Sequence, residues 1–402
     1  MTEAYIYDAV RTPRGLGKPS GGLHTLSPVD LGATVIRALH ERNGFEPTMI
    51  EEVIFGCGDP ADDQGGNVAR TSWLHAGMDE QVPGCVVTRF CASGLDAVNL
   101  AAAKVAAGQG DAVIAGGVEM MSLVPIGGGG GVWGVSAEFN TRTLFTPLGV
   151  AADLVATLAG HTREDVDAYA VASQERAARA WAEGRFSRSI VPVYDFNGEL
   201  CLDRDEHMRP GTTLEALGKL RPAFADMSDK AGFGEIVKRR YPEVNRLHHV
   251  HTGGNSSGVV DGASALLIGS KQLGEMLGIR PRARIVSSAS IGCDPCLMLV
   301  APADAARRAA QRAGMELDDI DLYEVNEAFA SVVLKFMEDT GIDHERVNVN
   351  GGAIAMGHPI GATGGMLVGT LLDELERADK ATGLVTMCVG LGMGVATVIE
   401  RV

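Results

Sequence analysis

The sequence carries one order of strand and helix signals twice, and this repetition constrains the fold more than any other feature. In the first half, apolar and β-branched runs predict four buried strands, at AYIYDAV, EEVIFGCG, GCVVTRF and DAVIAGGV. Helical patterns separate these runs near residues 28–42, 66–77 and 93–107. Strands that alternate with helices predict a mostly parallel sheet with helices on its faces.

The same order restarts after a long irregular region. Residues 122–250 hold the run GGGGG, a helical pattern near 163–184 and a stretch dense in Pro, Arg and Asp, which together indicate an insertion. The strand DGASALLIGS follows. Five further strands are predicted at RARIVSSASIG, DIDLYEVNEAF, RVNVNGGAI, GLVTMCVG and VATVIERV, with helices near 303–313, 327–339 and 362–377. The shared order of the two halves indicates an internal duplication.

Length, charge and cysteine usage narrow the class of protein. A chain of 402 residues exceeds what one core usually supports, so two cores or two similar halves are expected. The formal net charge of −16 disfavours nucleic acid or an anionic membrane as the main partner. No uninterrupted apolar run is long enough to span a bilayer, and seven scattered cysteines fit a reducing compartment. We therefore expect a cytoplasmic protein.

The duplication predicts that two particular loops face each other. In a pair of similar halves, the loop after the third strand of one half meets its counterpart from the other, and these loops are RFCASG, with Cys91, and GGAIAMGHPIGATGG, with His358. Cys91 comes just before a helix, whose free N–H groups and dipole favour an anion, so a lowered thiol pKa is expected. Taken alone, a buried cysteine is usually a small hydrophobe. Its position opposite a histidine favours a nucleophile and its base.

Two more loops follow predicted strands. NEAFA, residues 326–330, offers Asn326 as a neutral hydrogen-bonding group, although taken alone this residue type favours a helix cap. CVGLGMG, residues 388–394, offers Cys388, which alone could be buried filler, beside glycines whose amides can approach a ligand closely. All four loops lie at carboxyl ends of strands, where open α/β sheets typically bind ligands.

Six motifs in one order resemble the thiolase family over nearly the whole chain. They are CASGLDA, AGGVEMMS, TGGNSSG, NEAFA, GGAIAMGHPIGATGG and CVGLGMG. The resemblance implies an α/β fold, a five-layered αβαβα sandwich of two duplicated βαβαβαββ halves with an inserted loop domain. The implied boundaries are 1–121 with 250–275 for the first half, 122–249 for the loop domain and 276–402 for the second half.

The resemblance also implies catalytic roles. Cys91 would be the nucleophile that carries the acyl group, and His358 the base that activates it. Cys388 would move a proton to and from the α-carbon of acetyl-CoA or the thiol of CoA. One oxyanion hole would consist of His358 and a water held on Asn326, and a second of the backbone N–H groups of Cys91 and Gly390.

Coenzyme A would be a co-substrate, and no permanently bound cofactor is expected. By resemblance, Ser257 would lie by its pantetheine arm and Arg221 by its adenine end, while Phe329 would line the pocket. The segments HHVH and CDPC contain metal-ligating residue types, but neither has a ligand cluster at zinc-site spacing. No metal is therefore expected.

Two departures point to the degradative branch of the family, especially the thiolase subunits of bacterial β-oxidation complexes. Pro147 and Leu148 stand where short-chain biosynthetic thiolases have a His-Met pair over the acyl site, so Leu148 is a candidate substrate contact. Residues 225–251 form a longer loop than in those enzymes. The expected reaction is cleavage of 3-ketoacyl-CoA by CoA to acetyl-CoA and a shortened acyl-CoA, in fatty acid β-oxidation.

Other functions stay open at this point. A short-chain acetoacetyl-CoA thiolase working in the biosynthetic direction is the nearest alternative. A decarboxylating condensing enzyme would lack the cysteine of CxGxG, and an inactive lipid-carrying subunit would not need all four loop residues. By resemblance we expect a homodimer or homotetramer, with a hydratase/dehydrogenase subunit of a β-oxidation complex as a possible further partner.

Overall fold

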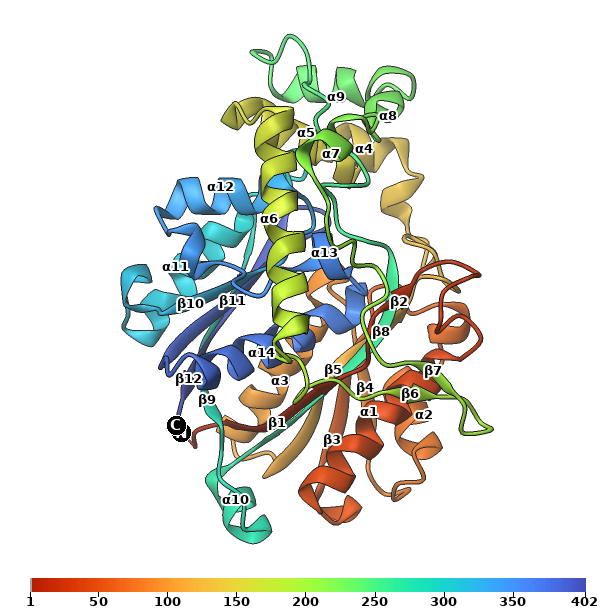
Figure 1. Cartoon of the computed structure of the whole chain (residues 1–402), viewed down its shortest axis with the longest axis vertical. Helices are drawn as coiled ribbons and strands as arrows, with labels where there is room; N and C mark the ends of the chain where they lie inside the picture. Colours follow the sequence, from red (N-terminus) through yellow and green to blue (C-terminus); the bar gives the residue numbers. More distant parts are fainter. Residues whose placement is uncertain (1) are drawn as a thin grey trace.

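A ten-stranded sheet organises the protein, whose computed structural model describes residues 2–402 (Figure 1). Its strands run in the order β10-β11-β12-β9-β1-β8-β5-β3-β4, and β2 pairs with β8. The first half contributes β1 (Tyr5–Arg11), β2 (Gly15–Leu16), β3 (Glu52–Gly56), β4 (Gly84–Val87), β5 (Ala112–Met120) and β8 (Val260–Gly269). The second half contributes β9 (Ala283–Gly292), β10 (Leu322–Val325), β11 (Thr382–Val389) and β12 (Met393–Arg401).

Helices cover and separate the two halves of this sheet. They are α1 (Pro28–Asn43), α2 (Val68–His75), α3 (Ser93–Ala106), α10 (Lys271–Leu277), α11 (Ala301–Ala313), α12 (Ala330–Thr340), α13 (Ala353–Met356) and α14 (Ile360–Arg377). Helices α1 and α2 pack on strands of the first half, and α11 packs on strands of the second. Helices α3 and α14 pack on each other and touch strands of both halves, so they form the central layer. The predicted five-layered fold is confirmed.

The strand order confirms the duplication. Without the short β2, the first half runs β4-β3-β5-β8-β1, which is third, second, fourth, fifth and first strand in chain order. The second half repeats this order as β10-β11-β12-β9, with residue 347 in the place of its third strand. The predicted strand RVNVNGGAI is therefore wrong as a full strand, because only one parallel bridge forms there, between Tyr323 and Val347.

The sheet is mixed rather than mostly parallel, which corrects the sequence-based expectation. Only β3 with β4, β3 with β5, and β10 with β11 pair in parallel. Strands β11 and β12 are joined through a turn in which Leu391 and Gly392 have φ of 65° and 78°, and so short a connection permits only antiparallel pairing. Strand β8 returns antiparallel to β5 after the whole insertion.

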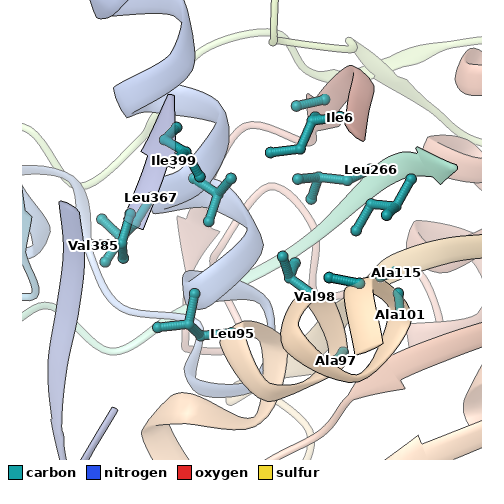
Figure 2. Close-up of a cluster of buried hydrophobic side chains, with 14 of the residues drawn as sticks. Ile6, Leu95, Ala97, Val98, Ala101, Ala115, Leu266, Leu367, Val385 and Ile399 are labelled. Carbon is teal, nitrogen blue, oxygen red and sulfur yellow. The ribbon is translucent and has the colours of Figure 1, made fainter. Parts of the chain in front are cut away.

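Glycines allow α3 and α14 to approach to backbone distance. A Cβ at Gly94 would lie 2.5 Å from the carbonyl oxygen of Gly361, and a Cβ at Gly364 would lie 2.0 Å from the backbone nitrogen of Leu95. Around this contact, Leu95 and Leu367 share one buried cluster with side chains of both sheet halves (Figure 2). The two helices begin directly after the loops that carry Cys91 and His358, so their contact brings those loops to one place.

The insertion covers parts of both halves, and Val193 is buried in the core of the first half. It contains α4 (Ala137–Thr143), α5 (Leu148–Ala159), α6 (Arg163–Ala182), β6 (Val193–Tyr194), β7 (Leu200–Leu202), α7 (Leu214–Gly218), α8 (Ala225–Asp229) and α9 (Phe233–Arg240). Helices α5 and α6 pack on α12, and most of the other inserted helices gather at the top of Figure 1. Asp205 ties the insertion to the first strand, because its carboxylate accepts two hydrogen bonds from buried Arg11 at 2.7 and 2.9 Å. The sequence-based domain boundaries stay predictions.

Among the described residues, no single helix is long and apolar enough to cross a membrane. Residues 137–159 and 163–182 reach the required length and composition only as a pair, and they are bent by 114° at their junction.

The glycine contact predicts opposite effects for two substitutions in α14. Gly364→Ala should lower the free energy of unfolding by about 2 kcal/mol, because its Cβ would collide with backbone that cannot yield. Gly369→Ala is the matched control and should raise the free energy of unfolding. Its Cβ would meet only the methyl group of Ala9, at 3.2 Å, and alanine favours a helix by about 1 kcal/mol over glycine. Urea unfolding of both variants checks this, and equal midpoints would contradict it.

Candidate active site

Cys91 lies in a strained turn. The turn is a short 3-10 helix, Phe90–Ala92, that leads into α3, and Phe90 has a φ of 45°, a left-handed conformation that bulky residues rarely adopt. Ser93 fixes this turn, since its hydroxyl accepts from the N–H of Arg89 at 2.9 Å and donates to the carbonyl of Phe90 at 2.6 Å. Strain of this kind clusters at functional sites, where surrounding contacts maintain it.

The environment of the Cys91 sulfur differs from the expectation for a helix end. Burial raises the pKa of the thiol to about 12, although the backbone N–H groups of Gly390 and of Cys91 itself face the sulfur and lower it. The negative charges of Glu119 and Asp59 raise the pKa further. The prediction of a lowered pKa is therefore wrong, because loss of water around a charged sulfur outweighs the helix terminus.

His358 is held as a neutral ring with one defined tautomer. Its Nδ1 lies 2.6 Å from the hydroxyl oxygen of Thr363, and that hydroxyl donates to the carbonyl of Pro359 at 2.8 Å. The hydroxyl oxygen must therefore accept the Nδ1–H proton, which leaves a lone pair on Nε2. Burial and the Arg14 guanidinium lower the pKa of His358 to about 3, so the ring can accept a proton but does not hold one at neutral pH.

Asn326 lies beside His358. Its side-chain nitrogen is 3.3 Å from Nε2 of His358, and its Oδ1 is buried without a donor among the described residues. The backbone N–H of Asn326 bonds to the carbonyl of Thr386 at 3.0 Å, which fixes the loop against β11. Helix α12 begins at Ala330 with Phe329 at its cap position. The helix-cap interpretation of Asn326 is therefore wrong, and the amide is free to serve the site.

Cys388 lies near the end of β11 and is fully buried. Burial raises its pKa well above the ordinary value, and the nearby sulfur of Cys91 raises it further. Two residues on, a Cβ at Gly390 would lie 3.6 Å from the ring of Phe90, so this loop covers the Cys91 turn. The structure thus places Cys91, Cys388 and Gly390 together. The backbone hydrogen bond from Asn326 to Thr386 holds the Asn326 loop, and with it His358, against β11, the strand that carries Cys388.

Sequence reasoning missed Glu119, which connects three parts of the site. This buried carboxylate accepts from the N–H groups of Gly58 at 2.6 Å and Gly361 at 2.7 Å, and from the amide of Gln64 at 2.7 Å. It therefore fixes the positions of β5, the loop after β3 and the first turn of α14 relative to one another. A charged residue inside the apolar run AGGVEMMS was the signal for it. Thr363 was also missed, because nothing in the sequence shows that its hydroxyl meets His358.

Of the four residues predicted to contact the substrate or CoA, three lie beside elements of the candidate site and the fourth, Arg221, lies on the surface. The backbone N–H of Ser257 bonds to the carbonyl of Ala328 at 3.0 Å, beside the Asn326 loop. Phe329 packs edge-on against Phe224, with ring centroids 5.8 Å apart, and Leu148 shares a cluster with Phe329 and Cys388. Arg221 is exposed, and no described contact joins its side chain to the other predicted residues.

The geometry of His358 predicts how the ring titrates. Because burial lowers its pKa, the neutral form should persist as the pH falls from 8 to about 5.5, whereas an ordinary histidine gains a proton near pH 6.5. Nitrogen-15 NMR of histidine-labelled protein can follow both ring nitrogens, with His358→Gln identifying the signals. An imidazolium signal for His358 above pH 5.5 would contradict the prediction. Thr363→Val should abolish the fixed tautomer, and Thr363→Ser should preserve it.

Comparisons with known proteins find relatives over the full length of the chain. The thiolase N-terminal domain matches residues 4–230, and the thiolase C-terminal domain matches residues 279–401. A beta-ketoadipyl-CoA thiolase of Pseudomonas aeruginosa is 40% identical over 100% of this chain and 99% of its own. A 3-ketoacyl-CoA thiolase of Bacillus subtilis is 39% identical, with 100% of both chains covered.

A solved structure is similar as well. The crystal structure of the Bacillus anthracis acetyl-CoA acetyltransferase has a TM-score of 0.85 and 33% sequence identity, and the match covers 100% of this chain and 99% of that one. Both the sequence and the fold therefore lead to one assignment: the chain belongs to the thiolase family.

Proposed function

We propose that this thiolase cleaves 3-ketoacyl-CoA with CoA, giving acetyl-CoA and a chain-shortened acyl-CoA through an acyl-Cys91 intermediate. One observation carries the proposal. Cys388 is buried close enough to Cys91 for a charge on that sulfur to raise its pKa, and two backbone amides face the sulfur of Cys91. A nucleophile, a second proton carrier and a preformed donor pair are what reversible carbon–carbon cleavage at a thioester requires.

In the first half-reaction, Nε2 of neutral His358 takes the proton of Cys91, and the sulfur attacks the 3-keto carbon. The N–H groups of Cys91 and Gly390 stabilise the resulting oxyanion. When the intermediate collapses, the electron pair of the C2–C3 bond moves to C2, and Cys388 donates a proton there to complete acetyl-CoA. The products are acyl-Cys91 and acetyl-CoA.

The tautomer of His358 gives it a second role in the same step. Once Nε2 has accepted the proton of Cys91, it becomes a donor, and it can then stabilise the enolate oxygen of the departing acetyl-CoA. Asn326 would hold a water at the same oxygen through its unpartnered Oδ1. Negative charge thus develops at two different oxygens, each with its own donors.

In the second half-reaction, Cys388, now a thiolate, takes the proton of the incoming CoA thiol. The CoA sulfur attacks the carbonyl of acyl-Cys91, and the Cys91 sulfur leaves with the proton held by His358. Both cysteines and the histidine return to their starting states. CoA is therefore a co-substrate rather than a resident cofactor in this scheme.

Relatives named 3-ketoacyl-CoA thiolase, from Bacillus subtilis and Shewanella frigidimarina, support the proposed substrate class. Pro147 and Leu148 at the start of α5, in the place of a His-Met pair, support acyl chains longer than that of acetoacetyl-CoA. A place in fatty acid β-oxidation, a homo-oligomeric state, a hydratase/dehydrogenase partner and a cytoplasmic location stay predictions.

The nucleophile can be tested directly. Cys91→Ser should abolish acyl-enzyme formation and turnover while keeping the fold, because a serine hydroxyl lacks the nucleophilicity of a thiolate. Mass spectrometry of the intact protein mixed with acetyl-CoA should show an acetyl adduct on Cys91 in the parent and none in the variant. Circular dichroism serves as the folding control. Thiolysis that survives in Cys91→Ser would remove Cys91 from its assigned role.

The second cysteine can be separated from the first. Cys388→Ala should still be acetylated on Cys91 by acetyl-CoA, because that attack requires no carbon acid to lose a proton. Condensation and thiolytic cleavage should fall by about 10²–10⁴-fold, the usual contribution of a general acid or base. Exchange of the α-protons of acetyl-CoA with deuterated water should be lost in parallel. If exchange continues at the parent rate, Cys388 is not the base.

A further inference from the structure

A row of aromatic rings leads away from the nucleophile into the insertion. Phe90, the residue before Cys91, lies edge-on to Trp133, with ring centroids 6.1 Å apart. Trp133 in turn lies edge-on to Phe145, at 5.5 Å. The three rings connect the turn that carries the reactive sulfur to the start of α5.

This aromatic row belongs to the wall of the proposed site. Phe145 is buried in one cluster with Cys388 and Phe329, and Trp133 and Leu148 pack against that cluster while staying partly exposed. A chain attached to Cys91 and extending toward the insertion would therefore run along these apolar side chains. Partly exposed apolar surface of this kind gains free energy when an alkyl or aryl group covers it.

The segment that carries Trp133 is fastened near the nucleophile by an acidic residue. The carboxylate of Asp59 accepts from the N–H groups of Gly127 and Gly129, each at 3.0 Å. Asp59 is buried, and its negative charge and that of Glu119 both act on Cys91 and raise the pKa of the thiol. The field around the sulfur from these side chains is therefore negative.

Two of the nearby basic side chains are paired closely with carboxylates. Arg89, at the turn of Cys91, is paired with Asp96. Arg142, the single Lys or Arg of the described segment 121–148, is 77% exposed and paired with Glu138 at 2.9 Å. Arg14 is buried, with Asp205 at 3.9 Å and the sulfur of Met366 at 3.3 Å, and its Nη1 has no hydrogen-bond partner among the described residues. Each of these three guanidinium groups has a carboxylate within ion-pair distance.

We propose that the acyl chain transferred to Cys91 ends in an uncharged alkyl or aryl group, and that 3-ketoacyl-CoAs with a terminal carboxylate are poor substrates. This inference rests on the proposed function, because it names the substrate class of the same site. A carboxylate against Phe145 and Leu148 would lose water without gaining a cation, and the single indole N–H of Trp133 would replace only one of its hydrogen bonds to water. The substrate preference of this enzyme would thus differ from the one that the names of its beta-ketoadipyl-CoA relatives imply.

The test compares two substrates that differ only at the far end of the chain. These are 3-oxohexanoyl-CoA and 3-oxoadipyl-CoA, which has the same carbon chain with a terminal carboxylate. The full-length enzyme should show a kcat/KM at least about 100-fold higher for the uncharged substrate, and it should also cleave 3-oxooctanoyl-CoA. Equal or faster cleavage of 3-oxoadipyl-CoA would overturn this inference and leave the proposed function standing. Absence of thiolysis with all of these substrates would instead overturn the proposed function.

Two variants at one position test whether the aromatic row sets the preference. Trp133→Arg should narrow the ratio of the two kcat/KM values by about 10-fold or more, because it supplies a cation for the carboxylate. Trp133→Ala should lower kcat/KM for 3-oxooctanoyl-CoA relative to acetoacetyl-CoA by about 10-fold, and it keeps the test valid if the arginine variant does not fold. Phe196→Ala is the matched control, since this aromatic residue is fully exposed in the hairpin between β6 and β7 (Figure 1). Unchanged ratios in both Trp133 variants would overturn the role of the row.

Discussion

The backbone contact between α3 and α14 is the constraint on which the site depends. Each helix follows a loop that holds one member of the proposed nucleophile and base pair, so the distance between the helices sets the distance between the loops. Gly94 and Gly364 allow that distance, because any side chain there would meet backbone of the opposite helix. Glu119 adds a second restraint, since it binds the first turn of α14 and the loop after β3 with one carboxylate.

Burial determines the chemical state of the site before substrate arrives. It raises the pKa of the Cys91 thiol to about 12 and, together with Arg14, lowers that of His358 to about 3, so both groups are neutral at pH 7. Charge therefore appears only when a proton moves from sulfur to nitrogen during the reaction. Preformed amides are effective under these conditions, because their interaction with a developing charge is strong where water is excluded. A dry site also protects a thioester intermediate from hydrolysis.

The same dry surroundings link reactivity to substrate choice. Cys91 is buried, and in the proposed reaction the aromatic row that begins at Phe90 would be the surface that the transferred acyl chain covers. Asp59 fastens this row through two glycine amides and, by its charge, opposes ionisation of the thiol. In the proposed reaction, Asp59 would therefore affect both the reactivity of the thiol and the surface that receives the acyl chain.

The sequence by itself determined the duplicated α/β order, the four loops and the residue types in them, because strand and helix periodicity and glycine placement are local signals. Tertiary structure alone decided the solvation and the hydrogen-bond partners of those residues. A helix terminus next to Cys91 predicts a lowered pKa, but the packing of distant loops removes water and reverses the shift. Asn326 has the pattern of a helix cap, yet the helix begins at Ala330 and the amide turns to His358 instead. The tautomer of His358 depends on Thr363, and the antiparallel centre of the sheet depends on β8, which returns after the whole insertion. Desolvation and contacts between distant segments depend on many parts of the folded chain at once, so no local sequence pattern predicts them.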